Sequence, residues 1–464
     1  MSGLLTRVGA TAALVCLSLA SAAGAAPRVH WFPGVKSPGT PARYDKVGVL
    51  KIGRSQARNV LVLEPGTEAG SAYFVPLARW IVSHAPGWQV WSVERRENLL
   101  EDQSVLNRAK VGRATDQQLF DYYLGFLKDP RIQHHFRFIP DRQVRFAKRW
   151  GLRVAVGDLH RVITAARRLG GKVALGGHSL GGGVTTAYAT WNFGGRPGAD
   201  QLAGLIYIDG GSFGKAESSS AARAALKGLN ASATGPWQAF GGITAPFAGL
   251  YNATGSTAAL IDPNSRSLGQ SSGLLNALGL TPSVPVTNLA QYGFALNVGT
   301  SPAGLLAAQA HLGRGISSTG SVRGWDGRGA LTPIGRFARM FSGSGVGNAD
   351  GTEWYFPQRL TLDLRGVGSG HANPAQRVLG LRTTLGRRLP RRLLIYGFGA
   401  RLGGQTILNE ARALAVQSHI PLRNLTLINR AGSYAHNDPA GAYPHNVFFS
   451  HLIPFLHAVA RRGR

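Results

Sequence analysis

The chain is poor in sulfur-containing and acidic residues. Its 464 residues include two methionines and a single cysteine, Cys16, which lies within the first 25 residues. Because we expect that segment to be removed, the mature protein should contain no disulfide bond. Its stability must then come from a hydrophobic core, which a chain of this length is able to bury without covalent cross-links.

Long hydrophobic runs are also missing, apart from one near the N-terminus. There, Arg7 precedes an apolar stretch over residues 8–20, and a small-residue series ending at Ala25 follows it. This layout is typical of a signal peptide, and the stretch is too short for a membrane span. We therefore predict a signal peptide at residues 1–25, cleavage near Ala25, and a secreted or cell-envelope-associated protein that does not span the membrane.

Acidic residues are scarce relative to basic ones, since 22 Asp and Glu stand against 51 Lys and Arg, a formal net charge of +29. A basic surface favours nucleic acid, anionic lipid or acidic polymers as partners. The sequence contains no nucleic-acid-binding motif, and an exported protein meets little DNA, so we expect no nucleic-acid partner. Two interpretations stay open: a specific anionic surface as partner, and an arginine-rich surface that is only solvated.

Metal-binding signatures are absent as well. Neither paired histidines at helical spacing nor clusters of cysteines occur in the sequence. Those patterns are the usual marks of a zinc or related site. We therefore expect no metal and no cofactor.

The sequence does contain an alternation of strand-like and helix-like segments. Such alternation predicts an α/β fold with a mainly parallel sheet and helices on both faces. We expect strands over residues 44–52, 59–63, 89–93, from 172 onward, 202–208, 393–396 and 425–428. We expect helices over residues 73–82, 156–169, up to 188, 407–416 and 447–459.

Residues 214–390 differ in character from the rest of the chain. Gly, Ser, Ala and Thr dominate there, and the apolar segments are short. A structureless loop of that length is implausible in a compact domain, so we predict a mostly helical insertion, with a poorly ordered linker as the alternative. The core would then consist of residues 26–213 and 391–464, with the insertion as a lid between two of its strands.

Ser179 is the candidate nucleophile. An apolar strand precedes it and three glycines, residues 181–183, follow its neighbour Leu180. When a strand is followed by a sharp turn and then by a helix, a serine in the turn has its hydroxyl above the edge of the sheet. The small residues let the turn and the helix pack closely. An inert serine in a glycine-rich turn is the alternative.

The G-x-S-x-G pattern around Ser179 is not informative without that context. With 63 glycines in the chain the pattern is expected by chance, and it recurs at Ser212 and Ser271. No strand precedes Ser271, and no small-residue helix follows Ser212. Ser179 is therefore the only one of the three in a strand–turn–helix setting.

These features together resemble the α/β-hydrolase superfamily: a strand, Gly-His-Ser-Leu-Gly-Gly, a helix, a late insertion and a histidine after the last strand. The resemblance covers about residues 43–213 and 390–460, and it places the insertion where relatives have a lid. The superfamily includes esterases, lipases, thioesterases and some peptidases. Because the turn holds serine rather than aspartate, the resemblance implies acyl transfer to water, in an esterase-like or lipase-like enzyme acting on a small-molecule or lipid-like acyl ester.

A serine nucleophile needs a base, because a free hydroxyl reacts poorly at neutral pH. The resemblance implies a histidine after the last core strand, and His436 holds that position. We expect His445, His451 and His457, further along, to be surface or packing residues. His178, beside the nucleophile, is common in lipase-like turns and is not usually the base.

The resemblance also implies an oxyanion hole made of two backbone N–H groups. One belongs to Leu180, directly after the nucleophile, and the other to Thr67 in the turn after the strand at residues 59–63. Many relatives have His-Gly-x where this chain has Pro65-Gly66-Thr67. The proline removes a side chain that often supports this loop, but it leaves the N–H of Thr67 in place.

The acid that would orient His436 is the least clearly marked member of the triad. Relatives usually carry it just after the strand that follows the lid, but residues 397–404 contain no carboxylate. Asp209 ends the preceding core strand, and some lipases take their acid there; holding the local turn by backbone hydrogen bonds is an equal alternative. We expect Glu410 to face solvent, and Asp438 lies close to His436 in sequence.

A charged group, Glu94-Arg95-Arg96, follows the strand at residues 89–93. The carboxyl edge of such a sheet is where ligands bind, so contact with substrate is one interpretation. An ion-paired loop is the other, and it is the simpler one.

Two functions from other classes stay open. The chain could be a catalytically silent binding protein with an α/β-hydrolase fold, or an exported serine peptidase. Hydrolysis of a short p-nitrophenyl ester separates the first from an esterase, and a comparison of ester with aminoacyl-amide substrates separates the second.

Overall fold

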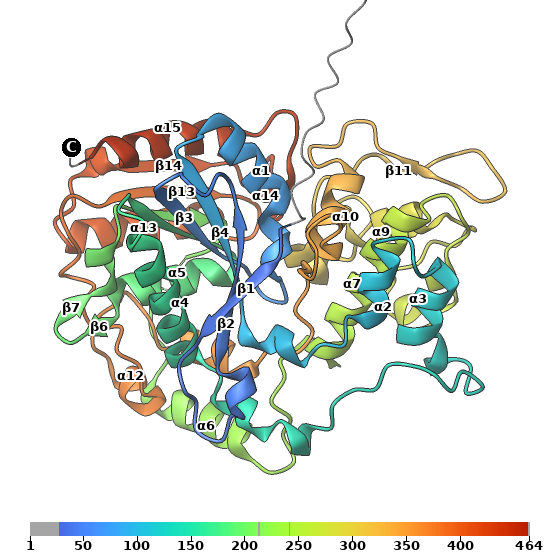
Figure 1. Ribbon diagram of the computed structural model, residues 1–464, viewed down its shortest axis with the longest axis horizontal. Coiled ribbons are helices and arrows are strands. Elements are labelled where there is room, and N and C mark those ends of the chain that lie inside the picture. Colours follow the sequence, from blue (N-terminus) through green and yellow to red (C-terminus); the bar gives the residue numbers. More distant parts are fainter. Residues whose placement is uncertain (1–26, 212–213, 241, 463–464) are drawn as a thin grey trace, which may run out of the picture.

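The computed structural model describes residues 27–211, 214–240 and 242–462. The predicted signal peptide and Ser212 lie outside the described residues. Figure 1 shows a central sheet with its covering helices on one side of the molecule and a second group of helices, which includes α2, α3, α7 and α9, on the other.

An eight-stranded sheet forms the centre, in the order β1-β2-β4-β3-β5-β8-β13-β14. β2 is antiparallel to its neighbours β1 and β4, and all the later pairs are parallel. The strands are β1 (Val29–Pro33), β2 (Lys46–Ile52), β3 (Asn59–Glu64), β4 (Trp88–Glu94), β5 (Val173–His178), β8 (Gly204–Ile208), β13 (Leu394–Gly399) and β14 (Leu425–Asn429). The predicted α/β class with a mainly parallel sheet is confirmed, although β1, an edge strand that ends in proline, was not predicted.

Helices cover both faces of this sheet, as predicted. Leu61 and Leu63 of β3 pack on one face and Val60 and Val62 on the other, because side chains along a strand alternate between faces. The first face is covered by α1 (Val75–His84) and α15 (Val447–Arg461), and the second by α4 (Leu152–Arg167), α5 (Leu180–Thr190) and α13 (Gly404–Gln417).

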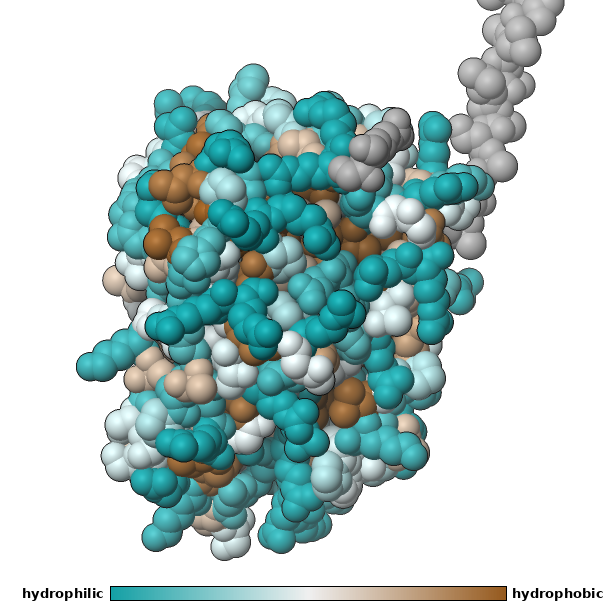
Figure 2. All heavy atoms as spheres, turned by 90° about the vertical axis from the view of Figure 1, so that its left-hand side faces the viewer, coloured by the Kyte–Doolittle hydropathy of each residue, from teal (hydrophilic) through white to brown (hydrophobic). Residues whose placement is uncertain are grey.

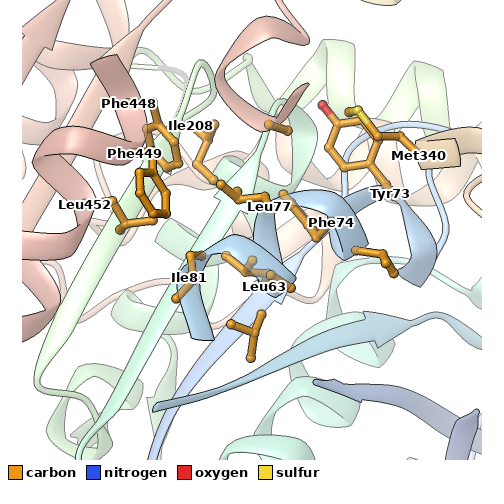
Figure 3. Packing of buried hydrophobic residues seen from close by; sticks show 14 of the residues in the cluster. Leu63, Tyr73, Phe74, Leu77, Ile81, Ile208, Met340, Phe448, Phe449 and Leu452 are labelled. Carbon is orange, nitrogen blue, oxygen red and sulfur yellow. The ribbon is translucent and has the colours of Figure 1, made fainter. Parts of the chain in front are cut away.

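The hydrophobic cluster on the α1 face continues into the insertion. In Figure 3, Leu77 and Ile81 of α1 lie beside Leu63, and Tyr73, in the short 3-10 helix Ser71–Phe74, lies beside Met340. Met340 belongs to α10 (Ile334–Ser342), a helix of the insertion. A single buried cluster therefore joins the sheet to the insertion.

The insertion between β8 and β13 contains helices joined by long irregular segments and two short two-stranded sheets, so it is less helical than predicted. Its helices are α6 (Ser219–Asn230), α7 (Ala245–Ile261), α8 (Gly273–Ala277), α9 (Asn288–Leu296), α10, α11 (Gln358–Leu364) and α12 (Pro374–Leu379). Trp354 and Phe337 are fully buried in it. Burial of large side chains is not expected of a poorly ordered linker, so that alternative is wrong.

A segment that the sequence assigned to the core packs instead with the insertion. It carries α2 (Ser104–Ala109) and α3 (Asp116–Tyr123), between β4 and α4. Its buried residues share one cluster with residues of the insertion: Leu106, Leu119, Tyr123, Phe136 and Trp150 with Trp237, Leu250, Trp354 and Tyr355. The group of helices beside the sheet is therefore built from two separate parts of the chain (Figure 1).

The surface is polar over the face shown in Figure 2, which lies at the left of Figure 1 and carries β14 and α13. Hydrophilic side chains cover most of that face, and hydrophobic ones form small separate patches. Within the described ranges, no helix combines the length and the hydropathy that crossing a bilayer requires.

Candidate active site

Ser179 occupies a strained turn between β5 and α5. Its backbone angles are φ 54° and ψ −125°, a conformation that is costly for a residue with a side chain. A Cβ atom on Gly181 would lie 2.2 Å from the carbonyl oxygen of Glu64, and one on Gly210 would lie 1.9 Å from that of Ser179. Only glycine fits at both places, so the glycines allow the turn, and Ser179 itself stays half-buried while the strand before it is buried.

His436 and Asp209 are in direct contact. Nδ1 of His436 lies 2.7 Å from Oδ2 of Asp209, and both side chains are almost completely buried. His436 comes from the loop after β14, and Asp209 directly follows β8, so the parallel sheet brings together residues that are far apart in sequence. The carboxylate is thus within hydrogen-bonding distance of the ring nitrogen.

Asp209 also holds the turn after β13, rather than the turn in which it lies itself. Its carboxylate accepts backbone hydrogen bonds from Ala400 at 2.7 Å, Leu402 at 3.1 Å, Gly403 at 2.9 Å and Gly404 at 3.2 Å. These residues belong to the segment that lacks a carboxylate of its own.

The surroundings of Asp209 keep it ionised. Burial alone would raise its pKa, but the hydrogen bond and the charge of His436 and the backbone N–H groups of Gly403 and Ala400 lower the pKa below its usual value. An ionised Asp209 accepts a hydrogen bond from a protonated Nδ1 of His436, which leaves Nε2 as a lone-pair acceptor. Nε2 is buried and has no hydrogen-bond partner among the described residues.

His178 supports the histidine loop and is not a base. Burial, and next the neighbouring His436, lower the pKa of His178 to about 3, so its ring is neutral. Its Nε2 donates to the backbone oxygen of His436 at 3.0 Å, and its ring stacks on that of Tyr73. The Tyr73 hydroxyl donates to Oδ1 of Asn437 at 2.9 Å. Two buried side chains therefore hold this loop, His178 at the backbone oxygen of His436 and Tyr73 at the side chain of Asn437.

The remaining candidates lie apart from this pair. His445 and His457 are exposed and His451 is half-buried on α15, where Nδ1 of its ring lies 2.9 Å from the backbone oxygen of Val447. Ser271 is exposed, and its hydroxyl donates to the backbone oxygen of Leu268.

The two rival carboxylates have other partners. Asp438 binds Nδ1 of His311 at 2.5 Å and the hydroxyl of Thr332 at 2.8 Å. Glu410 does not face solvent as we expected: it is half-buried, it accepts from the backbone N–H of Gly214 at 3.0 Å, and burial raises its pKa to about 7. The sequence did not reveal this, because residue 214 lies far from it along the chain.

The turn after β3 lies directly against the nucleophile. A Cβ atom on Gly66 would be 3.0 Å from the Cβ of Ser179 and 3.3 Å from Nδ1 of His178. Thr67 follows and is half-buried, as is Leu180. In the described part of the chain, the backbone N–H groups of Thr67 and Leu180 donate no hydrogen bond. Two free donors therefore flank Ser179 at the positions that the resemblance implies.

The charged group at the end of β4 is an ion-paired, buried arrangement. Arg95 pairs with Glu64 at 2.9 Å and with Glu353 of the insertion at 2.5 Å, and Arg96 pairs with Asp158 at 2.7 Å. Of the two interpretations of this group, the ion-paired loop is the one observed. The sequence did not point to Glu353, which lies in an aromatic run more than two hundred residues away.

The insertion lies over this edge of the sheet. Nδ2 of Asn437 donates to the backbone oxygens of Ala307 and Gln309, each at 3.1 Å. On the other side of Ser179, the backbone N–H of Glu353 donates to the oxygen of Glu68 at 3.0 Å. The insertion is thus bonded to both loops that flank the nucleophile. Among the described residues, no group of three or more His, Cys, Asp or Glu is placed to hold a metal ion.

The sheet order and the turn at Ser179 agree with the fold that the resemblance to the α/β-hydrolase superfamily implies. No protein-family model matches the sequence, and no curated protein is detectably similar to it.

Several solved structures are similar over most of the chain. A protein assigned as a lipase from Sulfolobus solfataricus has a TM-score of 0.43 and 15% identity, with 93% of each chain covered. A carboxyl esterase from Bacillus coagulans has a TM-score of 0.39 and 11% identity, covering 93% of this chain and 99% of the esterase. A proline iminopeptidase-related protein from Thermus thermophilus has a TM-score of 0.37 and 15% identity, covering 94% and 98%. Likeness at this level says nothing about activity, which has to be inferred from the site.

Proposed function

We propose that this protein is an exported serine hydrolase that cleaves carboxylic esters. The observation that carries the proposal is the buried hydrogen bond between Asp209 and His436, with Nε2 of His436 free of any partner in the described residues. Both residues stand at the edge of the sheet where Ser179 follows β5 in a strained turn. A nucleophile, an oriented base and a carboxylate in this order form the set that acyl transfer requires.

In the first half of the reaction, the Ser179 hydroxyl attacks the ester carbonyl carbon and gives its proton to Nε2 of His436. The carbonyl oxygen takes up the negative charge, and the backbone N–H groups of Leu180 and Thr67 stabilise it. The bond between carbon and the alcohol oxygen then breaks. The alcohol leaves with the proton from Nε2, and the acyl group stays on Ser179.

In the second half, water attacks the acyl carbon and gives a proton to Nε2. The same two N–H groups stabilise the oxyanion, and the bond to Ser179 breaks as its oxygen regains the proton. The carboxylic acid leaves. Asp209 stays ionised throughout, holds the Nδ1 proton in place and stabilises the transient imidazolium.

The insertion, over residues 214–390, serves in this proposal as the cover that selects the substrate. This role is supported by hydrogen bonds between the insertion and the two loops on either side of Ser179, one at Asn437 and the other at Glu68. A cover bonded at both places constrains the space in which an acyl ester is bound, so chain-length preference should change with substitutions there.

Export belongs to the same proposal and rests on the first 25 residues of the sequence. We expect the extracellular product to begin near Ala26 and to contain no thiol. Intact-mass analysis tests this directly, and a product that retains Met1 would exclude cleavage.

The experiment for the activity is Ser179→Ala assayed on a short p-nitrophenyl ester. We expect kcat to fall by several orders of magnitude with no change in thermal unfolding, because the fold does not depend on the hydroxyl. Ser271→Ala is the matched control: it lies in the same G-x-S-x-G pattern but on an exposed 3-10 helix, and it should leave kcat unchanged.

A parallel assay on aminoacyl amides separates an esterase from a peptidase. The proposal expects ester turnover to exceed amide turnover. A fully active Ser179→Ala protein would remove the proposal, and wild-type protein without ester turnover would favour the binding-protein alternative.

A further inference from the structure

We propose that Arg95 is a positioning residue that holds the turn after β3 in place, so that the N–H of Thr67 is aimed at the developing oxyanion. The inference rests on the proposed acyl transfer at Ser179 and adds a residue that acts on it from behind. Relatives often support this turn with a histidine side chain in the turn itself, and here proline stands in that position.

The guanidinium of Arg95 follows the course of the turn. Nη1 donates to the backbone oxygen of Pro65 at 3.0 Å, and Nη2 donates to those of Gly66 at 2.8 Å and Ala69 at 3.2 Å. Three carbonyl groups of one turn are thus bound by one side chain. Since a peptide unit is planar, fixing the carbonyl of Gly66 also fixes the direction of the N–H of Thr67.

Two carboxylates hold Arg95 in that orientation. Nη1 donates to Glu64 at 2.9 Å, and Nε and Nη2 both donate to Oε2 of Glu353, at 2.8 and 2.5 Å. Every N–H direction of the planar group is therefore used, which a lysine cannot reproduce. Burial alone would lower the pKa of Arg95, but Glu353 and Glu64 raise it above its usual value, so the group stays charged in its buried site.

A movement of the turn after β3 would affect Ser179. The position of a Cβ on Gly66 is 3.0 Å from the Cβ of Ser179, so the turn and the nucleophile are in contact. A shift of several tenths of an ångström would either press on Ser179 or draw the Thr67 donor away. Oxyanion donors act only at about 2.7–3.1 Å from the position of the oxyanion, so small shifts are costly in rate.

Glu353 gives the arrangement a further consequence. It belongs to the insertion, and its backbone N–H also binds the oxygen of Glu68, next to Thr67. The backbone of this insertion residue thus binds the turn directly, and its side chain acts on the turn through Arg95. The insertion therefore supports the oxyanion donor as well as covering the site.

The chain offers a matched control one residue away. Arg96 is as deeply buried as Arg95 and just as fully paired, with Asp158 at 2.7 Å and Asp45 at 2.8 Å. Its one backbone acceptor in the described residues is Val35, at 2.9 Å, and it donates no hydrogen bond there to the turn after β3. Arg96→Lys therefore carries the general cost of changing a buried arginine without the proposed effect on the turn.

The test compares Arg95→Lys and Arg96→Lys in the mature protein. We expect Arg95→Lys to lower kcat on a p-nitrophenyl ester by about 10- to 100-fold, with KM within about threefold, because the oxyanion exists only after attack. Arg96→Lys should keep kcat within about threefold. The midpoint of thermal unfolding should shift to a similar extent in both variants. A loss of kcat in Arg95→Lys alone can then not be due to lower stability.

Hydrogen exchange gives a readout that does not depend on activity. Amides of residues 64–70 should exchange at least about tenfold faster in Arg95→Lys and at the wild-type rate in Arg96→Lys. If the wild-type protein turns over no ester, the proposed function fails, and this comparison still decides whether Arg95 orders the turn.

The inference is overturned if Arg95→Lys keeps wild-type kcat and wild-type exchange at residues 64–70, or if both variants lose activity equally. Should Arg95→Lys fail to fold, Glu353→Gln replaces it. That variant keeps the shape of the side chain but removes the charge that holds Arg95, and it should lower kcat about three- to tenfold with the same local increase in exchange. Wild-type values for both readouts in Glu353→Gln would contradict the inference.

Discussion

The two sides of Ser179 differ in how charge is used. On the side of His436, one ionised carboxylate, Asp209, faces one imidazole and several backbone N–H groups. On the side of the turn after β3, many carboxylates are buried together around Arg95: Glu64, Glu94, Glu97, Asp350 and Glu353. In the proposed mechanism, the first side supplies the base, and the second supplies rigidity behind the oxyanion donors.

Burial raises the pKa of the carboxylates at both places, but the net shift is opposite. The hydrogen bond and charge of His436, with two backbone donors, outweigh burial and lower the pKa of Asp209. Around Arg95 there are more acids than bases, so burial prevails and raises the pKa of Glu64 and of Asp350 to about 7. Substitution of Asp209 should therefore alter chemistry, and substitution of a buried acid such as Asp350 should alter the dependence of stability on pH.

The largest expected effect comes from Asp209→Asn. An asparagine can present its NH₂ group to Nδ1 of His436, which moves the proton to Nε2 and removes the base. We expect kcat on a p-nitrophenyl ester to fall by about 10⁴-fold, measured on protein shown to be folded by circular dichroism. Asp438→Asn, in the same loop, should lower kcat by no more than about tenfold. If Asp438→Asn costs as much as Asp209→Asn, the role of the acid has been assigned to the wrong residue.

A smaller effect is expected at the contact between the turn and the nucleophile. Gly66→Ala adds a Cβ 3.0 Å from that of Ser179, so the turn has to move by a few tenths of an ångström. We expect kcat to fall about tenfold, with KM nearly unchanged in steady-state assays. Gly228→Ala is the control, because its Cβ would meet nothing within 4 Å in helix α6 and should slightly stabilise the protein. Equal kcat values for the two variants would show that the turn has room to move.

The side of Arg95 should make stability depend on pH. The pKa values of Glu64 and Asp350 are raised by burial to about 7, so the folded protein binds more protons than the unfolded chain. Their contribution to the free energy of unfolding is complete at pH values below the ordinary carboxyl pKa. It is lost as the pH rises through 7. His178 acts oppositely, since burial, then His436, lowers its pKa to about 3; its contribution is lost only as the pH falls below its usual value of 6.5.

Of these groups, only the carboxylates should change the stability between pH 6.5 and 8. We therefore expect Tm, measured by differential scanning calorimetry, to fall by several degrees over this range. Asp350→Asn should flatten this fall, because the amide keeps the shape of the side chain without titrating. A Tm that rises over this range, or a slope that Asp350→Asn leaves unchanged, would mean that the buried acids do not titrate as described.

Much of the core could be predicted because its signals are local. The strand at residues 59–63 is observed as Asn59–Glu64, and the helix at 447–459 as Val447–Arg461. Ser179 stands out because its strand, turn and glycines are consecutive in sequence. Asp209 and His436 could be proposed because parallel strands bring their carboxyl ends to one edge, so a residue after each strand is a candidate for the site.

The rest could not be predicted because its contacts join distant segments. The sequence gives Arg95 no indication of its partner Glu353, 258 residues away, and contact with Glu64 requires that β3 and β4 be neighbours. The helices α2 and α3 pack with the insertion because both bury apolar side chains against it, and either could equally have covered the sheet. Glu353 directly precedes the aromatic run Trp354-Tyr355-Phe356, and this was the one available sign that it is buried and paired.

The most direct test of the account is covalent labelling of the mature protein with a fluorophosphonate, followed by peptide mapping of the adduct. A phosphonate reacts with a serine only where a base activates the hydroxyl and donors receive the oxyanion, so it reports the whole site at once. The account predicts one adduct, on Ser179, which is absent in Ser179→Ala and strongly slowed in Asp209→Asn. No adduct, or an adduct on Ser212 or Ser271 that persists in Ser179→Ala, would contradict it.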